Sequence, residues 1–320
     1  MKDLLRIADL SPAGLQQALS LSIVAQMVPH RWSEALQGES VVLYFSKPAT
    51  RTRISFETAV ARLGGTPIVV GPSELQLGRG ETIEDTARVI SRFAKAFVIC
   101  TFDDEDVRRF AAAATIPVIN ALTDGHHPCQ ALADLMTLRQ HFGRLPGLKV
   151  AYLGDGNNVA HSLMEACALA GVDIAVATPP GFEPADDVLE TAECLAVENG
   201  SIAWATHDPL LAVAGAHAVY TDVWMSMGVP EDERAAREAA FRPYEVTGAV
   251  MAEADPSAVF MHCLPAHRGE EVAADVIDGP RSVVFDQAEN RLHTAVGLLR
   301  GLLHRDLRGA DEDEPYSKSA

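Results

Sequence analysis

Two arginines and two threonines stand together where an apolar run meets a helical pattern. Thr50, Arg51, Thr52 and Arg53 follow the run at residues 41–45. Free N–H groups at a helix start bind anions, and planar guanidinium groups are well suited to phosphate. The turn therefore predicts a phosphate site. Its spacing is not that of a Walker loop, so a solvated basic helix start is the alternative.

A second candidate follows the apolar run at residues 117–122. His127 and Gln130 can donate hydrogen bonds to a carbonyl oxygen that gains negative charge during acyl-type transfer. Open α/β sheets bind ligands beyond the carboxyl ends of their strands, so we expect this loop to face a cleft between domains. A helix-capping loop with a surface histidine is the alternative.

Two further predicted strand ends carry groups that suit an amino acid. Asp222 can hold an ammonium group, while Cys263 and the carbonyl group of Leu264 can orient a nearby amine. The loop after residues 149–153 begins like a dinucleotide-binding loop, but Val159 stands where a third glycine is needed. Its asparagines suit an amino-acid head group better. Each strand end alone could equally be a packed structural feature.

The composition favours a globular protein that binds small molecules. The chain has 320 residues, 48% of them hydrophobic, which is enough for one large domain or two ordinary ones. With 26 Lys and Arg against 44 Asp and Glu, the net charge of −18 disfavours broad binding of nucleic acid or anionic membranes. An anionic ligand must therefore be held by a local group of cations.

Cysteine usage and hydropathy favour a cytoplasmic protein. The five cysteines show no CxxC spacing, so we expect reduced thiols rather than disulfides or a structural zinc site. No apolar run approaches the roughly 20 residues that span a bilayer, and the first residues do not resemble a secretion signal. We therefore expect no membrane partner.

Short β-branched runs alternate with helical segments along the chain, which predicts an α/β fold with two parallel-sheet domains. The boundary is expected near residues 132–147, where a helix at residues 131–142 ends in a loop rich in glycine. The tail at residues 309–320 is acidic and is expected to be disordered. The predicted strands cover residues 41–45, 67–70, 97–101, 117–122, 149–153, 174–177, 218–222, 259–263 and 282–285.

Taken together, these motifs resemble the ornithine carbamoyltransferase family of the aspartate/ornithine carbamoyltransferase superfamily, over residues 1–305. The resemblance implies two parallel-sheet α/β domains joined by two helices. Residues 1–132 and 293–308 would form a carbamoyl-phosphate domain, and residues 133–292 an ornithine domain. It also implies a homotrimer, or a multiple of trimers, with active sites at subunit interfaces.

The reaction implied is transfer of the carbamoyl group from carbamoyl phosphate to the δ-amine of L-ornithine, with no metal or organic cofactor, in arginine biosynthesis. The resemblance assigns catalysis to Arg51, His127, Asp222 and Cys263. Gln76 resembles a residue that is lent to a neighbouring subunit's site. The residues implied in carbamoyl-phosphate binding are Ala49, Thr50, Arg51, Thr52, Gln76, Cys100, His127, Gln130 and Arg291, and those implied in ornithine binding are Asn158, Asp222, Ser226, Met227, Cys263 and Leu264.

Two positions depart from the family pattern. Ala49 replaces a serine whose hydroxyl would bind phosphate, and Cys100 replaces an arginine that contacts phosphate and carbamoyl oxygens. Losing one preorganised donor costs about a hundred- to a thousandfold in rate. Three explanations are open: another cation such as Arg53 or Arg79 reaches in, a different amine is the acceptor, or the protein is a weakly active or non-catalytic regulatory paralogue.

Overall fold

The computed structural model describes residues 1–76, 80–225 and 230–310. Ser226, Met227, Arg79 and most of the predicted acidic tail lie outside these ranges. The chain divides into two compact units, which are described separately below. Unit 1 comprises Met1–Leu132 with Arg291–Ala320, and unit 2 comprises Ala133–Asn290.

Unit 1 is built on a parallel sheet in which the strands follow the order β2-β1-β3-β4. Hydrophobic side chains on β1, β3 and β4 are buried, as expected for parallel strands that are covered by helices, whereas the edge strand β2 is more exposed. The register pairs the last residues of β1 and β3, Phe45 and Cys100. The strands are β1 (Ser40–Phe45), β2 (Thr66–Val70), β3 (Ala96–Cys100) and β4 (Val118–Leu122).

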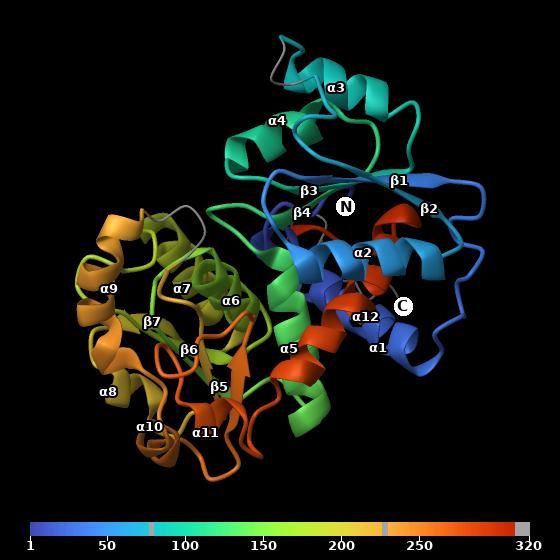
Figure 1. Cartoon of the computed structure of the whole chain (residues 1–320). Helices are drawn as coiled ribbons and strands as arrows, with labels where there is room; N and C mark the ends of the chain where they lie inside the picture. The colour runs from blue at the N-terminus through green and yellow to red at the C-terminus, as the bar shows by residue number, and fades with distance from the viewer. Residues whose placement is uncertain (77–79, 226–229, 311–320) are drawn as a thin grey trace. The chain divides into compact units, whose positions relative to one another are not determined.

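Helices cover both faces of this sheet. In Figure 1, α3 and α4 lie on one face and α2 lies on the other. Residues of α3 and α4 share a buried core with β1 and β3, in which the rings of Phe97 and Phe110 stack with centroids 4.0 Å apart. The helices are α1 (Pro12–Met27), α2 (Thr50–Arg62), α3 (Ile83–Ile90), α4 (Asp104–Ala113), α5 (Pro128–Phe142) and α12 (Val284–Leu303), the last two of which continue across the unit boundaries.

Unit 2 contains a second parallel sheet, in the order β7-β6-β5-β8-β9. One face packs against α8, α10 and α11 in a core of alanines and valines with larger side chains such as Phe260 and Tyr244, and α6 and α7 pack on each other beside β6 and β7. The strands are β5 (Lys149–Leu153), β6 (Asp173–Ala177), β7 (Ala203–Thr206), β8 (Ala218–Thr221) and β9 (Val259–His262), and the helices are α6 (Asn158–Leu169), α7 (Asp186–Asn199), α8 (Pro209–Val213), α9 (Arg234–Phe241), α10 (Gly248–Glu253) and α11 (Ala274–Ile277).

The expected fold class, two parallel-sheet α/β domains, is confirmed. One predicted strand is wrong: at residues 282–285 the structure has an isolated bridge between Ser282 and Phe260, and α12 begins at Val284. Val283 and Val284 of this run are buried where a helix begins, and a short apolar window cannot distinguish a helix start from a strand. The strand β7 is an addition, because Trp204 and the alanines on either side of it gave no β-branched run. Across the described residues, no helix is long and apolar enough to cross a membrane.

Candidate active site

The predicted phosphate turn forms the start of α2. Strand β1 ends at Phe45, and the helix begins at Thr50 with Ala49 as its N-cap residue. Ala49 has no side-chain oxygen, and within the described part of the chain no side chain caps this helix start. The N–H groups of the first turn therefore keep the donor capacity that an anion can use.

Arg291 brings two of the predicted side chains together. Its Nη2 donates to Oγ1 of Thr52 at 2.7 Å, and its Nη1 donates to Oε1 of Gln130. All three residues are at most 4% exposed. A buried guanidinium on α12 thus links the first turn of α2 to the first turn of α5, across 239 and 161 residues of sequence.

His127 lies in the same charged neighbourhood. Burial lowers the pKa of its imidazole well below the usual value, and the nearby charges of Arg291, Arg51 and Lys47 lower it further. A hydrogen bond to the backbone of Ala121 acts in the opposite direction. The neutral imidazole is therefore the favoured form at neutral pH, as a hydrogen-bonding partner for a carbonyl group requires. We call Thr52, His127, Gln130 and Arg291 the unit 1 cluster.

Cys100 is the last residue of β3 and lies near the unit 1 cluster, but its thiol adds no charge there. Its side chain is fully buried, and burial raises the pKa of the thiol to about 11, although Lys47 and Arg291 oppose this rise. The thiol is therefore protonated at neutral pH. Lys47, which the sequence analysis did not select, is the cation that acts most strongly on it.

The other cations considered from sequence are placed differently. Arg53 lies on the exposed side of α2, where its Nε donates to Oε1 of Glu57 at 2.6 Å. Gln76 is exposed after β2 and takes no part in the bonds made by Arg291. Arg53 is therefore held by its own helix, and the role expected for Gln76 depends on a neighbouring subunit.

In unit 2, three polar side chains meet at the carboxyl ends of adjacent strands. The Sγ of Cys263, which follows β9, donates to Oδ1 of Asp222 at 2.9 Å, and Asp222 follows β8. The Nδ2 of Asn157, after β5, donates to the other oxygen of Asp222 at 2.9 Å. Asp222 is 6% exposed, and these contacts leave it as a buried carboxylate suited to an ammonium or amine group. We call Asn157, Asp222 and Cys263 the unit 2 cluster.

The sequence analysis noted the asparagines of this loop but assigned a binding role only to Asn158 and not to Asn157. Asn157 is the N-cap of α6, and its Oδ1 accepts from the N–H groups of Val159 and Ala160. The signal was present, because asparagine directly before a helical pattern is a preferred N-cap. Asn158 is the first residue of the helix and is half-buried.

The loop after β9 is held in an uncommon conformation. Leu264 has a φ of 59°, and its N–H group donates to Nδ1 of His262 at 2.8 Å. A positive φ at leucine costs free energy and often marks a functional site.

Side-chain atoms of Asp222, His262 and Cys263 that could bind a metal ion lie within 4.8 Å of one another, but the thiol of Cys263 already donates a hydrogen bond to the carboxylate of Asp222. The arrangement favours binding of an amine over binding of a metal ion.

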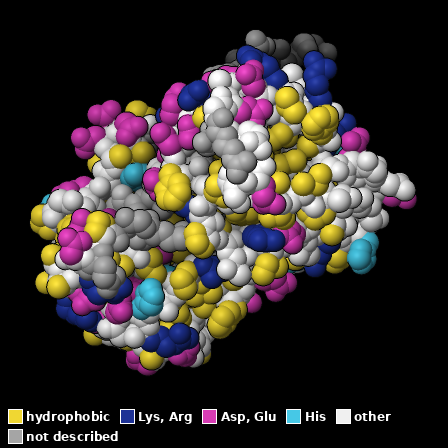
Figure 2. All heavy atoms as spheres, turned by 45° about the horizontal axis from the view of Figure 1, so that its top comes forward, with side chains coloured by type: hydrophobic (Ala, Val, Ile, Leu, Met, Phe, Trp, Pro, Cys, Tyr) yellow, Lys and Arg dark blue, Asp and Glu magenta, His cyan; other side chains and the backbone are white. Residues whose placement is uncertain are grey.

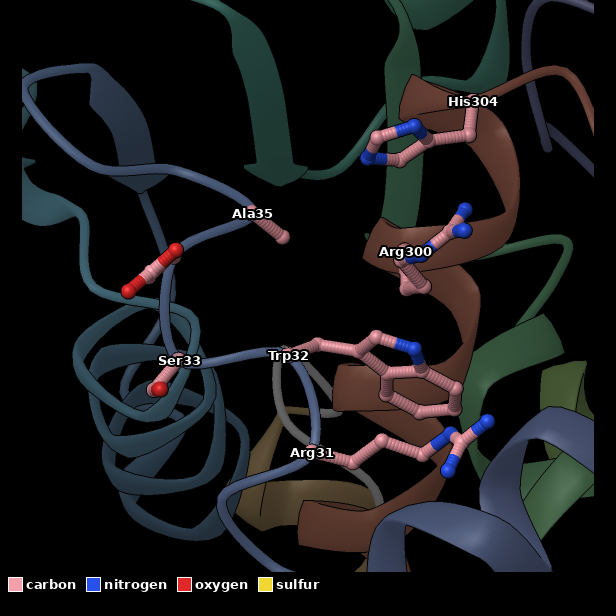
Figure 3. Close-up of a pocket in the computed structure, with 7 residues that line it drawn as sticks. Arg31, Trp32, Ser33, Ala35, Arg300 and His304 are labelled. Carbon is pink, nitrogen blue, oxygen red and sulfur yellow. The ribbon is translucent and has the colours of Figure 1, made fainter.

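A cavity of about 450 Å³ lies elsewhere in unit 1, between the loop after α1 and the end of α12. Figure 3 shows the imidazole of His304 pointing toward its interior and Trp32 beside Arg300. The guanidinium of Arg300 lies 5.7 Å from the Trp32 ring centroid and donates to Asp306. The residues that line this cavity include none of those predicted for the active site.

Comparison with known families agrees with the two-unit arrangement. Residues 2–140 match the family model described as aspartate/ornithine carbamoyltransferase, carbamoyl-P binding domain. Residues 146–302 match the model for the Asp/Orn binding domain of the same family. The chain belongs to the aspartate/ornithine carbamoyltransferase family.

Relatives within this family are similar over nearly their whole length. The chain is 58% identical over 308 residues to the ornithine carbamoyltransferase of Parafrankia sp., covering 95% of this chain and 97% of that protein. It is 48% identical over 304 residues to the Bacillus subtilis ornithine carbamoyltransferase, covering 95% and 94%. The solved ornithine carbamoyltransferase of Pyrococcus furiosus superposes with a TM-score of 0.90 at 48% identity, covering 94% and 96% of the two chains. The resemblance inferred from the motifs is confirmed.

Proposed function

We propose that this chain transfers the carbamoyl group of carbamoyl phosphate to the δ-amine of L-ornithine, giving L-citrulline and phosphate. The observation that carries the proposal is the buried guanidinium of Arg291, bonded to Thr52 and Gln130. Relatives that share 48–58% identity over more than nine-tenths of the chain are named ornithine carbamoyltransferases, which supports the same acceptor here.

Carbamoyl phosphate would bind to unit 1. Its phosphate oxygens would accept hydrogen bonds from the backbone N–H groups of Ala49, Thr50 and Thr52. They would also accept hydrogen bonds from the guanidinium of Arg51, because helix starts and arginines bind phosphate well. The carbamoyl group would lie against Thr52, His127 and Gln130, which the bonds of Arg291 keep in place. Preorganised donors of this kind stabilise the oxygen that becomes negative during transfer.

Ornithine would bind to unit 2. Asp222 offers a buried carboxylate for an amino group, and Cys263 and the backbone of Leu264 would contact the reacting end of the side chain. Asn158 would hold the α-carboxylate end. Ser226 and Met227 are expected to complete this pocket, and both lie outside the described residues.

The chemistry follows from the charges of the two groups. The neutral δ-amine attacks the carbamoyl carbon, a C–N bond forms, the C–O bond to phosphate breaks, and the proton that the amine loses passes to the departing phosphate. A carboxylate beside the amine binds its ammonium form, and the proton must leave before attack. The departing phosphate leaves with the bond electrons, so cations around it lower the barrier. No step requires a metal ion or an organic cofactor.

We further propose a cytoplasmic homotrimer, or a multiple of trimers, acting in arginine biosynthesis. Two domains joined by α5 and α12 would carry the carbamoyl-phosphate and ornithine sites, and Gln76 would reach a neighbouring subunit. Sedimentation equilibrium would test the assembly, since a monomer at micromolar concentration contradicts it. Mixing inactive Gln76→Ala and Arg51→Ala chains would test the shared site, because only a shared site lets some mixed trimers regain activity.

The function is tested by citrulline formation from carbamoyl phosphate and L-ornithine with purified protein. Activity that requires both substrates supports the proposal. Absence of product above the background of a heat-treated sample would reject it.

A second candidate is a carbamoyltransferase with another amine acceptor, or a protein that binds carbamoyl phosphate without turnover. Cys100 motivates both, because its thiol is uncharged where the family pattern has a cation. A panel of diamines and substituted ornithines would reveal a different acceptor. Calorimetric binding of carbamoyl phosphate without any turnover would support the non-catalytic alternative.

A further inference from the structure

The carboxyl end of β3 lacks the positive charge that carbamoyl phosphate chemistry needs. Cys100 pairs in register with Phe45 of β1, and its thiol is fully buried. Because burial keeps this thiol protonated, it can neither attract the phosphate nor repel it strongly. A compensating cation must come from another element.

The neighbouring arginines are already engaged. Arg53 is paired with Glu57 on the exposed side of α2, and Arg291 donates to Thr52 and Gln130. Arg51 belongs to the helix start that is proposed to bind phosphate. Among the residues that the structure describes, the loop directly after β1 is the next source of positive charge.

Lys47 lies two residues beyond the end of β1, and its side chain is only 3% exposed. Its ammonium pairs with Asp124, which follows β4, and lies 4.5 Å from the ring centroid of Phe102, which follows β3. Strands β1, β3 and β4 are neighbours in the sheet. The ammonium is therefore held at the carboxyl ends of three adjacent strands, where α/β sheets bind ligands.

The charge of Lys47 acts on the thiol of Cys100 and on the imidazole of His127. It opposes the rise in the pKa of Cys100, and it lowers the pKa of His127. The backbone N–H of Lys47 also hydrogen-bonds the thiol of Cys100. The side chain thus belongs to the same electrostatic neighbourhood as the thiol and the imidazole.

Burial of this ammonium is costly unless a partner compensates for it. The side chain of its partner Asp124 is 63% exposed, so the carboxylate can turn into solvent when a phosphate dianion takes its place. Figure 2 shows Asp and Glu side chains spread among basic and hydrophobic ones on one face of the protein, whose net charge is −18.

Building on the proposed function, we propose that Lys47 contacts bound carbamoyl phosphate and supplies the positive charge that Cys100 cannot. Its ammonium would stabilise negative charge on the phosphate and on the bridging oxygen as the C–O bond breaks. An ammonium acts as a point charge and does not make the bidentate contact of a guanidinium, so partial replacement of an arginine is expected.

The experiment compares Lys47→Gln and Lys47→Arg with the matched control Lys95→Gln. Lys95 directly precedes β3, at the end of the strand opposite to Cys100, with its side chain 52% exposed and paired with Glu39 at 3.5 Å. We expect Lys47→Gln to lower kcat/KM for carbamoyl phosphate by about a hundredfold or more, the effect of losing one preorganised charge. Lys47→Arg should recover most of that loss, and Lys95→Gln should remain within about twofold.

Two further measurements separate contact with the substrate from a role in folding. Inorganic phosphate, a product of the reaction, should bind Lys47→Gln at least tenfold more weakly than Lys95→Gln in calorimetry, whereas thermal midpoints report folding. A loss of activity with unchanged phosphate affinity, or an equal loss in kcat/KM for ornithine that follows a lower thermal midpoint, would overturn the proposal. If the unmodified chain makes no citrulline, the proposed function fails, and phosphate affinity still tests Lys47.

Discussion

The unit 1 cluster and the unit 2 cluster are held together in different ways. In unit 1, Arg291 on α12 bridges Thr52 and Gln130, which lie 239 and 161 residues away in sequence. In unit 2, Asp222, Asn157 and Cys263 follow neighbouring strands of one sheet. The first cluster depends on a helix from the end of the chain, and the second depends on sheet register.

This difference explains where the chain departs from its family pattern. Phosphate carries several oxygens and can be held by cations from more than one element, so the loss of one donor can be offset by another. An amine, in contrast, has a single nitrogen, so its binding depends on one carboxylate in a fixed position. The two departures expected from the resemblance, Ala49 and Cys100, both lie in unit 1, and the resemblance gave no departure among the residues predicted in unit 2.

The largest effect is expected for Arg291→Gln, which removes the bridge of the unit 1 cluster. It leaves two buried polar side chains without their charged partner, so kcat/KM for carbamoyl phosphate should fall by about a thousandfold or more. The thermal midpoint should fall as well. Arg300→Gln, on the same helix with a partly exposed bond to Asp306, is the control and should change neither quantity strongly. Activity within tenfold of the unmodified chain would refute the role of the bridge.

Asp222→Asn should impair the role of the unit 2 cluster and leave that of the unit 1 cluster intact. The substitution keeps the size of the side chain but removes the charge that would hold an amine, so kcat/KM for ornithine should fall by about a hundred- to a thousandfold. The affinity for inorganic phosphate should not change. Asp255→Asn, an exposed carboxylate of unit 2 that is bonded to Ser257, provides the control. A weaker affinity for phosphate with normal use of ornithine would contradict the assignment.

Cys100→Arg should raise activity if the missing cation limits the chemistry. Because Lys47 is proposed to supply part of that charge, the expected gain in kcat is about tenfold, below the full effect of one donor. The site is fully buried, so overpacking should cost about 1–3 kcal/mol of stability, measured by urea unfolding. Cys100→Ser adds no charge and serves as the control. An unchanged or lower rate in a folded protein would indicate a pocket rebuilt for another substrate.

The smallest effect concerns pH. The pKa of His127 is lowered in the folded protein, so the unfolded chain takes up a proton at this residue first as the pH falls. The stability contribution of the neutral imidazole is present above about pH 6.5 and is lost as the pH falls toward the folded pKa, by at most about 1.4 kcal/mol per pH unit. His127→Gln should flatten the curve of unfolding free energy against pH between pH 6.5 and 5. Parallel curves for His127→Gln and the unmodified chain would contradict this.

Most of the fold could be predicted from the sequence, because parallel strands buried on both faces give continuous β-branched runs. Residues 149–153 were predicted with the bounds that β5 has. The error at residues 282–285 arose because Ser282, Val283 and Val284 read as a strand, whereas the structure uses them to enter α12. Strand β7 was missed because half of its residues are alanines.

The candidate site was less predictable. Asp222 and Cys263 could be paired because both follow strands of one sheet, but Arg291 came only through the family resemblance. Its bonds to Thr52 and Gln130 join residues that no local spacing connects. Lys47 was missed because a lone lysine after a strand carries no signal until its burial and its neighbours Phe102 and Asp124 are known.

The central claim is that the two clusters serve one carbamoyl transfer from phosphate to ornithine. The most direct measurement is the ratio of citrulline to phosphate released when the purified chain receives both substrates, corrected for spontaneous breakdown of carbamoyl phosphate. The account predicts one citrulline for each phosphate and no phosphate release above background without ornithine. Phosphate release that does not depend on ornithine, or that yields no citrulline, would contradict it.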